Sequence, residues 1–342
     1  MPKKKSTIIN ICLLAFLIIV TFLLIFKDYS FLDTINIMIK AKRRYIILAI
    51  IMMLLAIVFE SFNVKSILKS LDKKVSLLKT IKYTFIGFFF SGVTPGGSGG
   101  QPIEIYYMKK DNIPITASTL SLLLQLCSYH IITIILGIIS LFINPQLVTT
   151  KFICIFVIGF ILKTLTLSMM LIGLFSKKIS KLLVNVMIKI LTFFKYSKTD
   201  EVSNNLRNSL TTYNQGSKFI REHKMIIIKS LCIVFVQVLF NYSVTYFVYK
   251  SFGLSEYSYL DIITSQALLL VATSSIPLPG AVGISENAFL TIYEKIFTMQ
   301  YLPSALLLSR GITFYLFMFI SLIIVTINAV YLKKKSKDLQ YN

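Results

Sequence analysis

The stretch Gly92-Val-Thr-Pro-Gly-Gly-Ser-Gly-Gly-Gln-Pro-Ile-Glu104 concentrates glycine and proline directly after an apolar segment at about 81–93. That segment is too short to cross a bilayer as a helix, which needs about 20 apolar residues. A short apolar segment that runs into glycine and proline is typical of a helix that enters the membrane and stops partway. The stretch therefore predicts a re-entrant half-helix.

A second stretch has the same character. Ile276-Pro-Leu-Pro-Gly-Ala-Val-Gly-Ile-Ser-Glu286 follows another short apolar segment, at about 262–276. Both stretches contain Pro-Gly-x-x-Gly, at 95–99 and 279–283, and both place a glutamate shortly afterwards. We interpret the two stretches as a weak internal repeat. Inverted repeats with broken helices that meet near the midplane mark the binding site of many transporters.

The rest of the chain supplies full membrane crossings. Of its 342 residues 56% are hydrophobic and 15% are charged, whereas soluble domains are about 45–50% apolar and about 25% charged. This composition excludes intrinsic disorder and argues strongly against a soluble enzyme. Six apolar segments are long enough to span, at about 7–26, 45–62, 115–143, 152–175, 225–249 and 303–332. We therefore predict an all-α polytopic integral membrane protein with about six full spans plus two re-entrant elements in an inverted repeat.

We expect one transmembrane domain over 1–342. Within it, 81–143 holds the first re-entrant motif and the following span, and 262–332 holds the second motif and the last span. The segment 176–224 is a basic cytoplasmic linker. Its first part, 176–195, repeats apolar residues at helical spacing opposite lysines, which predicts an amphipathic helix on the anionic inner leaflet.

The net charge of +22 is explained by membrane topology more simply than by nucleic acid. Most of the 36 basic residues fall on one side if the N-terminus is cytoplasmic, and the cluster Lys42 to Arg44 is the exception. The positive-inside rule then predicts a multi-pass membrane protein with both termini cytoplasmic.

Charged residues within the apolar segments are the second signal, since each costs about 2.5–3.5 kcal/mol to insert. Glu104 and Glu286 belong to the two motifs, and Arg310 and Lys163 lie in spans. We expect the two basic residues to face an anionic headgroup while the glutamates pair with them or cap the half-helices. For Lys163 and Glu60, snorkelling to the membrane surface or a purely structural ion pair is as good an explanation as a functional role. The predicted lipid-binding and translocation site comprises Pro95, Gly96, Gly97, Gly99, Gly100, Gln101, Glu104, Lys163, Pro279, Gly280, Gly283, Glu286 and Arg310.

Familiar catalytic motifs are missing from the sequence. It contains no HExxH and no Walker loop, and its histidines and cysteines are not spaced as metal ligands. We predict no catalytic residue, no metal and no cofactor.

The two motifs, Thr94-Pro-Gly-Gly-Ser-Gly-Gly-Gln-Pro-Ile-Glu-Ile-Tyr-Tyr-Met-Lys-Lys110 and Pro277-Leu-Pro-Gly-Ala-Val-Gly-Ile-Ser-Glu286, resemble those of a known family. It is the lysylphosphatidylglycerol synthase transmembrane, or flippase-like, family, which includes the membrane half of the bacterial multiple peptide resistance factor. The resemblance covers about 7–332, with Ala281 where the family often has a second glycine. It implies that the chain binds and translocates phospholipids, phosphatidylglycerol or lysyl-phosphatidylglycerol, and contributes to resistance to cationic antimicrobial peptides.

Full-length synthases of this family carry a soluble C-terminal domain that transfers lysine from lysyl-tRNA to phosphatidylglycerol. The chain ends at Asn342, so we expect no such domain and no enzyme activity of the chain by itself. Three alternatives stay open: a phosphatidylglycerol lysyltransferase acting alone or with a separate catalytic subunit, a carrier of a polyprenyl-linked sugar, and a scaffold for envelope enzymes. Phospholipids are the expected partners. Nucleic acid enters only as lysyl-tRNA, under the transferase alternative, and a homo-oligomer is also open.

Overall fold

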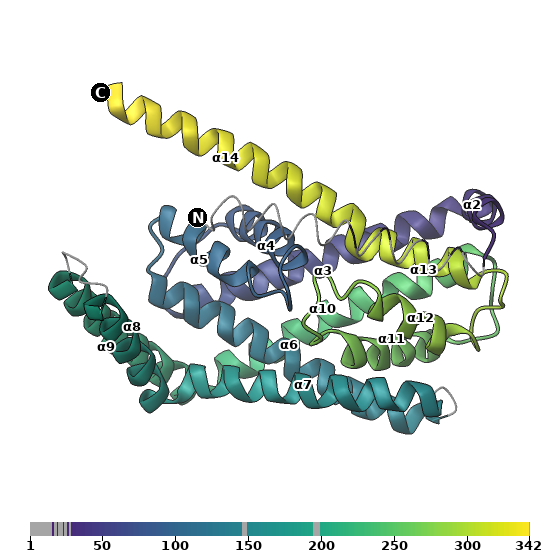
Figure 1. The fold of residues 1–342 in the computed structure, drawn as a ribbon, viewed down its shortest axis with the longest axis horizontal. Coiled ribbons are helices and arrows are strands. Elements are labelled where there is room, and N and C mark those ends of the chain that lie inside the picture. The colour runs from purple at the N-terminus through teal and green to yellow at the C-terminus, as the bar shows by residue number, and fades with distance from the viewer. Residues whose placement is uncertain are drawn as a thin grey trace.

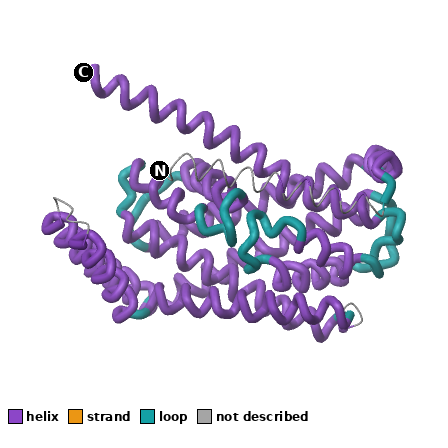
Figure 2. The backbone as a smooth tube through the Cα atoms, viewed as in Figure 1, coloured by secondary structure: helices purple, strands orange, loops and turns teal. Residues whose placement is uncertain are grey.

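The computed structural model describes residues 29–145, 149–193 and 199–341, together with Phe16, Ile19, Leu23 and Phe26. Every regular element in these residues is a helix (Figure 2). Five helices are long and apolar enough to cross a membrane: 43–70, 115–143, 152–175, 224–251 and 302–330. The prediction of an all-α polytopic membrane protein is thus confirmed. The first predicted span, 7–26, falls mostly outside the described residues.

The described helices run in chain order as follows: α2 (Phe31–Lys40), α3 (Arg43–Ser70), α4 (Leu77–Gly92), α5 (Gly100–Lys110), α6 (Ile115–Ile143), α7 (Thr150–Phe175), α8 (Lys177–Phe193), α9 (Thr199–Glu222), α10 (Lys224–Ser251), α11 (Tyr259–Thr273), α12 (Ile284–Tyr293), α13 (Leu302–Arg310), η2 (Gly311–Leu316) and α14 (Phe317–Tyr341). The apolar pattern does not single out α2, because ten residues are too few for a span.

Polar caps fix where several helices begin. The Ser76 hydroxyl accepts a hydrogen bond from the backbone amide of Lys79 at the start of α4. At the start of α11, Ser258 and Asp261 form a reciprocal capping box. Such caps satisfy amide groups that have no partner within the helix.

The centre of the bundle is formed by α3 and α10, which pack along each other. Around this pair lie α4, α6 and α11, and α7 runs along α6 and α11 on one side (Figure 1). The largest buried apolar cluster joins these elements, with Val244, Leu268 and Phe317 fully buried in it. The core therefore lies between helices that are distant in sequence.

The connections gather at the two ends of the bundle. The linker end, as we call it, holds the turns 71–76 and 111–114 together with α8 and α9 (Figure 1). The opposite end, the α2 end, holds α2 and the connections 252–258 and 294–301. A hydrogen bond of 3.0 Å from Ser304 Oγ to the Thr34 carbonyl ties α13 to α2 there.

Two helices break inside the bundle. The pair α4–α5 starts and finishes at the linker end, and the pair α11–α12 starts from the α2 end. The connecting loops meet in an isolated antiparallel backbone bridge between Pro95 and Pro279. Figure 2 shows these loops in the middle of the bundle, away from the connections at its ends. The two motifs thus approach each other from opposite ends of the molecule.

The last apolar segment is less regular than the sequence suggests. The sequence predicts one span over 303–332, but the helix changes to π-helical winding at 311–316, directly after Arg310. Short π-helical segments inside α-helices are frequent at functional sites.

The linker 176–224 folds into two packed helices, α8 and α9. The predicted amphipathic helix at 176–195 corresponds to α8. The following polar segment also forms a helix, and it docks on the bundle: Tyr213 donates a 2.9 Å hydrogen bond to the Gly173 carbonyl, and Ile220 is fully buried.

Candidate functional site

The two loops that meet share one backbone conformation. Gly96 and Gly280 have φ of +60° and +58°, and the next residues, Gly97 and Ala281, have φ of +68° and +51°. The amide of each second residue bonds, at 3.1 Å, the carbonyl three residues earlier. The sequence repeat therefore builds the same turn twice. Ala281 occupies a left-handed conformation that favours glycine.

Glycine also allows close approach at three positions, namely Gly99, Gly100 and Gly280. A Cβ atom on Gly100 would lie 2.0 Å from Ser91 Oγ and 2.8 Å from the Gly87 carbonyl oxygen, so α5 could not begin so close to α4. A Cβ atom on Gly280 would lie 2.4 Å from the Phe314 ring. Gly99 is similarly close to Thr94, which donates to the Phe90 carbonyl at 2.6 Å and accepts from the Gly99 amide at 2.9 Å.

The second loop is held by an ion pair. Arg310 Nε donates to Glu286 Oε1 at 2.7 Å, and Arg310 Nη2 donates to the Gly280 carbonyl at 2.9 Å. The other carboxylate oxygen of Glu286 accepts from the Gly283 amide at 2.7 Å and from Ser285 Oγ at 2.9 Å. The guanidinium carbon lies 4.7 Å from the centre of the Phe314 ring. Glu286 therefore both caps α12 and pairs with Arg310, and two nitrogens of Arg310 are committed to protein partners.

The first glutamate is placed differently. Glu104 lies within α5 and is 8% exposed. Its carboxyl group fills the space that Gly87 leaves on α4, where a Cβ would come within 1.9 Å of Glu104 Oε1. Among the described residues Glu104 forms no side-chain hydrogen bond and no ion pair. It neither caps a half-helix nor pairs with Arg310.

The starts of the two inner half-helices consequently differ. The N-terminus of α12 is capped by its own Glu286. The helix α5 begins at Gly100, its N-cap residue Gly99 supplies no side-chain cap, and its first turn contains Gln101 and Pro102. An uncapped helix N-terminus carries partial positive charge and favours an anion.

Lys163 is brought to the second loop by α7. Its side chain is fully buried, and Nζ donates to Ser274 Oγ at 2.6 Å, directly after the end of α11. The amino group also lies 5.5 Å from the centre of the Tyr129 ring. The structure thus places Lys163 beside the second motif, and it unites Pro95, Gly96 and Pro279 at the contact between the motifs.

A polar network links Glu60 to three amide side chains that the predicted site does not include. The network contains a chain of side-chain hydrogen bonds. Asn63 Nδ2 donates to Gln125 Oε1, and Gln125 Nε2 donates to Gln237 Oε1 at 3.0 Å. Gln237 Nε2 in turn donates to Glu60 Oε2 at 3.2 Å. Three helices contribute, namely α3, α6 and α10. The signal was present as polar residues at helical spacing within apolar segments, since Glu60 and Asn63 are three residues apart.

A cavity of about 200 Å³ adjoins this network. Glu60, Gln125, Tyr129, Gln237 and Asn241 supply its polar lining, while Phe88 of α4 closes it with apolar side chains of α3, α6 and α10. Among the described residues no group of three His, Cys, Asp or Glu side chains could hold a metal ion.

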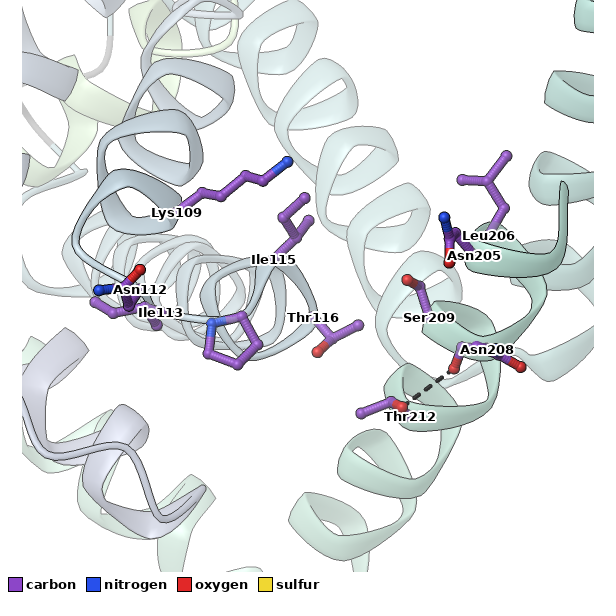
Figure 3. A pocket seen from close by; sticks show the side chains of 11 residues that line it. Lys109, Asn112, Ile113, Ile115, Thr116, Asn205, Leu206, Asn208, Ser209 and Thr212 are labelled. Atoms are coloured by element: carbon purple, nitrogen blue, oxygen red, sulfur yellow. Dashed lines mark hydrogen bonds between the residues drawn. The ribbon is translucent and has the colours of Figure 1, made fainter. Parts of the chain in front are cut away.

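A larger groove of about 750 Å³ lies at the linker end, between the α5–α6 turn and α9 (Figure 3). It is lined by Lys109, Asn112, Ile113, Pro114, Ile115, Thr116, Asn205, Leu206, Asn208, Ser209 and Thr212. In Figure 3 Lys109 extends from α5 toward the side that α9 borders. No residue of the predicted site lines this groove.

Comparison with known proteins places the chain in a family. The family model described as the lysylphosphatidylglycerol synthase TM region matches residues 8–321. A UPF0104 membrane protein of Pyrococcus horikoshii is 23% identical over 308 residues, which cover 83% of this chain and 87% of that protein. Its name specifies a membrane protein and no substrate.

Proposed function

We propose that this chain, which belongs to the lysylphosphatidylglycerol synthase transmembrane family, binds a phospholipid and moves its headgroup across the membrane. The lipid in this proposal is anionic or aminoacylated, with phosphatidylglycerol and lysyl-phosphatidylglycerol as the leading choices. Export of a lysylated lipid would lower the negative charge of the outer surface and so reduce binding of cationic antimicrobial peptides. The proposal places the chain in a bacterial cell membrane with both termini in the cytoplasm.

The observation that carries the proposal is the contact of two broken helices from opposite ends of the bundle, at Pro95 and Pro279. Irregular backbone at membrane depth is tolerated only where protein buries it or where it lines a wet cavity. Helix breaks of this kind form substrate sites in many transporters because they leave polar backbone groups at the midplane.

The headgroup phosphate in this proposal lies at the start of α5. That N-terminus has no side-chain cap, whereas the N-terminus of α12 is occupied by Glu286. Gly97 and Gly99 keep the loop narrow enough for a headgroup to approach the backbone. Lys163 adds positive charge beside the opposite loop, and Arg310 holds that loop through Glu286 and the Gly280 carbonyl.

Gly97→Val tests this site. The substitution puts a β-branched side chain at φ +68° in the loop, so we expect membrane insertion to persist and lipid movement to fall at least about tenfold. The measurement is the movement of fluorescent phosphatidylglycerol and lysyl-phosphatidylglycerol across vesicles that contain equal amounts of purified protein.

Gly173→Val is the matched control, because a Cβ at Gly173 of α7 meets nothing within 4 Å. It should move lipid like the unchanged protein. Equal rates for Gly97→Val and Gly173→Val would contradict a role of the loop in lipid handling.

Mass spectrometry of lipids that co-purify with the protein distinguishes the remaining candidates. Enrichment of a polyprenyl-linked sugar over phosphatidylglycerol would replace the phospholipid proposal with the alternative carrier. Formation of lysyl-phosphatidylglycerol by the purified chain from lysyl-tRNA would favour the lysyltransferase alternative.

A further inference from the structure

Glu60 is an acidic residue inside a membrane span that has one hydrogen bond and no ion pair among the described residues. It lies on α3 and lines the cavity of about 200 Å³, where it is partly exposed. Gln237 is the one described residue that donates a hydrogen bond to it, and no described basic side chain forms an ion pair with it. A charge inside a membrane protein normally has a partner or a function.

The groups that face Glu60 come from every element around the cavity. From α10 it meets the neutral amides of Gln237 and Asn241, and from α4 the apolar ring of Phe88. From α6 it meets Gln125 and the Tyr129 hydroxyl, which lies within electrostatic range of the carboxyl group.

Two further ionisable groups lie at a greater distance. Glu104 of α5 is a second acidic residue within electrostatic range of Glu60. Lys163 of α7 lies beyond the Tyr129 ring and bonds Ser274. The surroundings therefore offer hydrogen-bond donors to the carboxylate but no neutralising charge in contact with it.

The chain of amide hydrogen bonds connects the carboxyl group of Glu60 to residues on α6 and α10. All three amide donors point toward the carboxylate, in the order Asn63, Gln125, Gln237. The chain joins α3 and α6 to α10; α3 packs against α4, and α10 packs against α11. At the far end the Oδ1 atom of Asn63 is buried and has no hydrogen-bond partner among the described residues.

We propose that Glu60 binds and releases a proton from the cavity, and that its protonation state sets the contact between α3 and α10. As a carboxylate, Glu60 accepts a charge-assisted hydrogen bond from Gln237, which holds α10 against α3. When a proton adds to the carboxylate, the carboxyl group is neutral and becomes a donor, so this bond weakens or the amide chain reverses. Release of the same proton to water restores the first state.

For lipid transport, this inference rests on the proposed function: one proton would move with or against each headgroup. Proton binding itself does not depend on that function, so the two can fail separately.

The first measurement concerns proton binding alone. Infrared spectra of the protein in lipid nanodiscs are recorded across a pH titration, and the carbonyl band of protonated carboxyl groups is followed. We expect one titrating component of that band to disappear in Glu60→Gln and to persist in Glu256→Gln, the control at an exposed glutamate. An unchanged band in Glu60→Gln overturns the proposal.

The second measurement concerns the contact between α3 and α10. Hydrogen exchange of α3 and α10 should change with pH in the unchanged protein and in Glu256→Gln, and should be independent of pH in Glu60→Gln beyond the intrinsic chemistry of exchange. The same pH dependence in all three proteins overturns the proposed control of this contact.

The third measurement uses vesicles with a pH gradient and with the membrane potential held at zero by potassium and valinomycin. Coupling of one proton to one lipid predicts an accumulation ratio that changes about tenfold per pH unit. Glu60→Gln should still equilibrate lipid but show no accumulation. Lipid movement that ignores the gradient in the unchanged protein overturns the coupling and leaves the proposed function intact. Absence of any lipid movement contradicts the proposed function, while the first two measurements still decide proton binding.

Discussion

Arg310 is committed to Glu286 and to the Gly280 carbonyl, and Glu286 is only 5% exposed. We predict that Arg310→Gln leaves a buried unpaired carboxylate and costs about 3–5 kcal/mol of stability, and that adding Glu286→Gln recovers most of it. Arg310→Lys should fall between, because lysine cannot reproduce both directions of the guanidinium bonds. The measurement is the thermal unfolding temperature of purified protein in one detergent.

Lys218→Gln provides the control at the residue scale, since Lys218 pairs with Glu222 where both side chains are 56% exposed. Exposed pairs of this kind contribute little, so its unfolding temperature should stay near that of the unchanged protein. A stable, active Arg310→Gln protein would show that the ion pair does not hold the second loop.

At the scale of elements, the α4–α5 hairpin is closed at the linker end by Asp111. Its carboxylate accepts hydrogen bonds from Lys82 Nζ at 3.0 Å and from the Tyr83 hydroxyl. Partial burial acts to raise the pKa of Asp111, but the two hydrogen bonds and the charges of Lys82 and Lys79 outweigh it and lower the pKa below its ordinary value of 3.8.

Because the pKa of Asp111 is lower in the folded protein, its stabilisation is present above the ordinary pKa and is lost as pH falls through the folded-state pKa. We predict that Asp111→Asn costs about 1.5 kcal/mol at pH 7. The difference from the unchanged protein should shrink as pH falls below about 3.8. Unfolding temperatures measured from pH 3 to 7 test this, and a difference that is constant over this range would contradict a role for the charge of Asp111.

For the whole molecule, we predict that the two ends of the bundle lie on opposite sides of the membrane and differ in their accessibility to reagents outside the cell. In a protein without native cysteines, single cysteines at Ser30 and Ser255 mark the α2 end, and those at Lys74 and Asn204 mark the linker end. With cytoplasmic termini, a membrane-impermeant thiol reagent applied to intact cells should label the first two and not the last two. Labelling of Lys74→Cys or Asn204→Cys from outside would reverse the topology.

The membrane class and the boundaries of most membrane-spanning helices follow from the amino-acid sequence. The apolar segments 115–143 and 152–175 correspond closely to α6 and α7, because a bilayer crossing is specified by local hydropathy. The two helix breaks were also local, since proline and glycine disfavour the continuation of a helix. The helix α2 and the π-helical segment after Arg310 were not predictable, because neither has a distinctive apolar pattern.

Which polar groups meet depends instead on how the helices pack. Arg310 had two candidate glutamates, and the close packing of Gly280 on Phe314 brings Glu286 to it while Glu104 points to Gly87 on another helix. Glu60 and Gln237 bond across 177 positions of sequence, and no local pattern specifies such a pair. The reason is physical: hydropathy and helix breaks act on neighbouring residues, whereas the partner of a buried polar group is fixed by how distant helices pack.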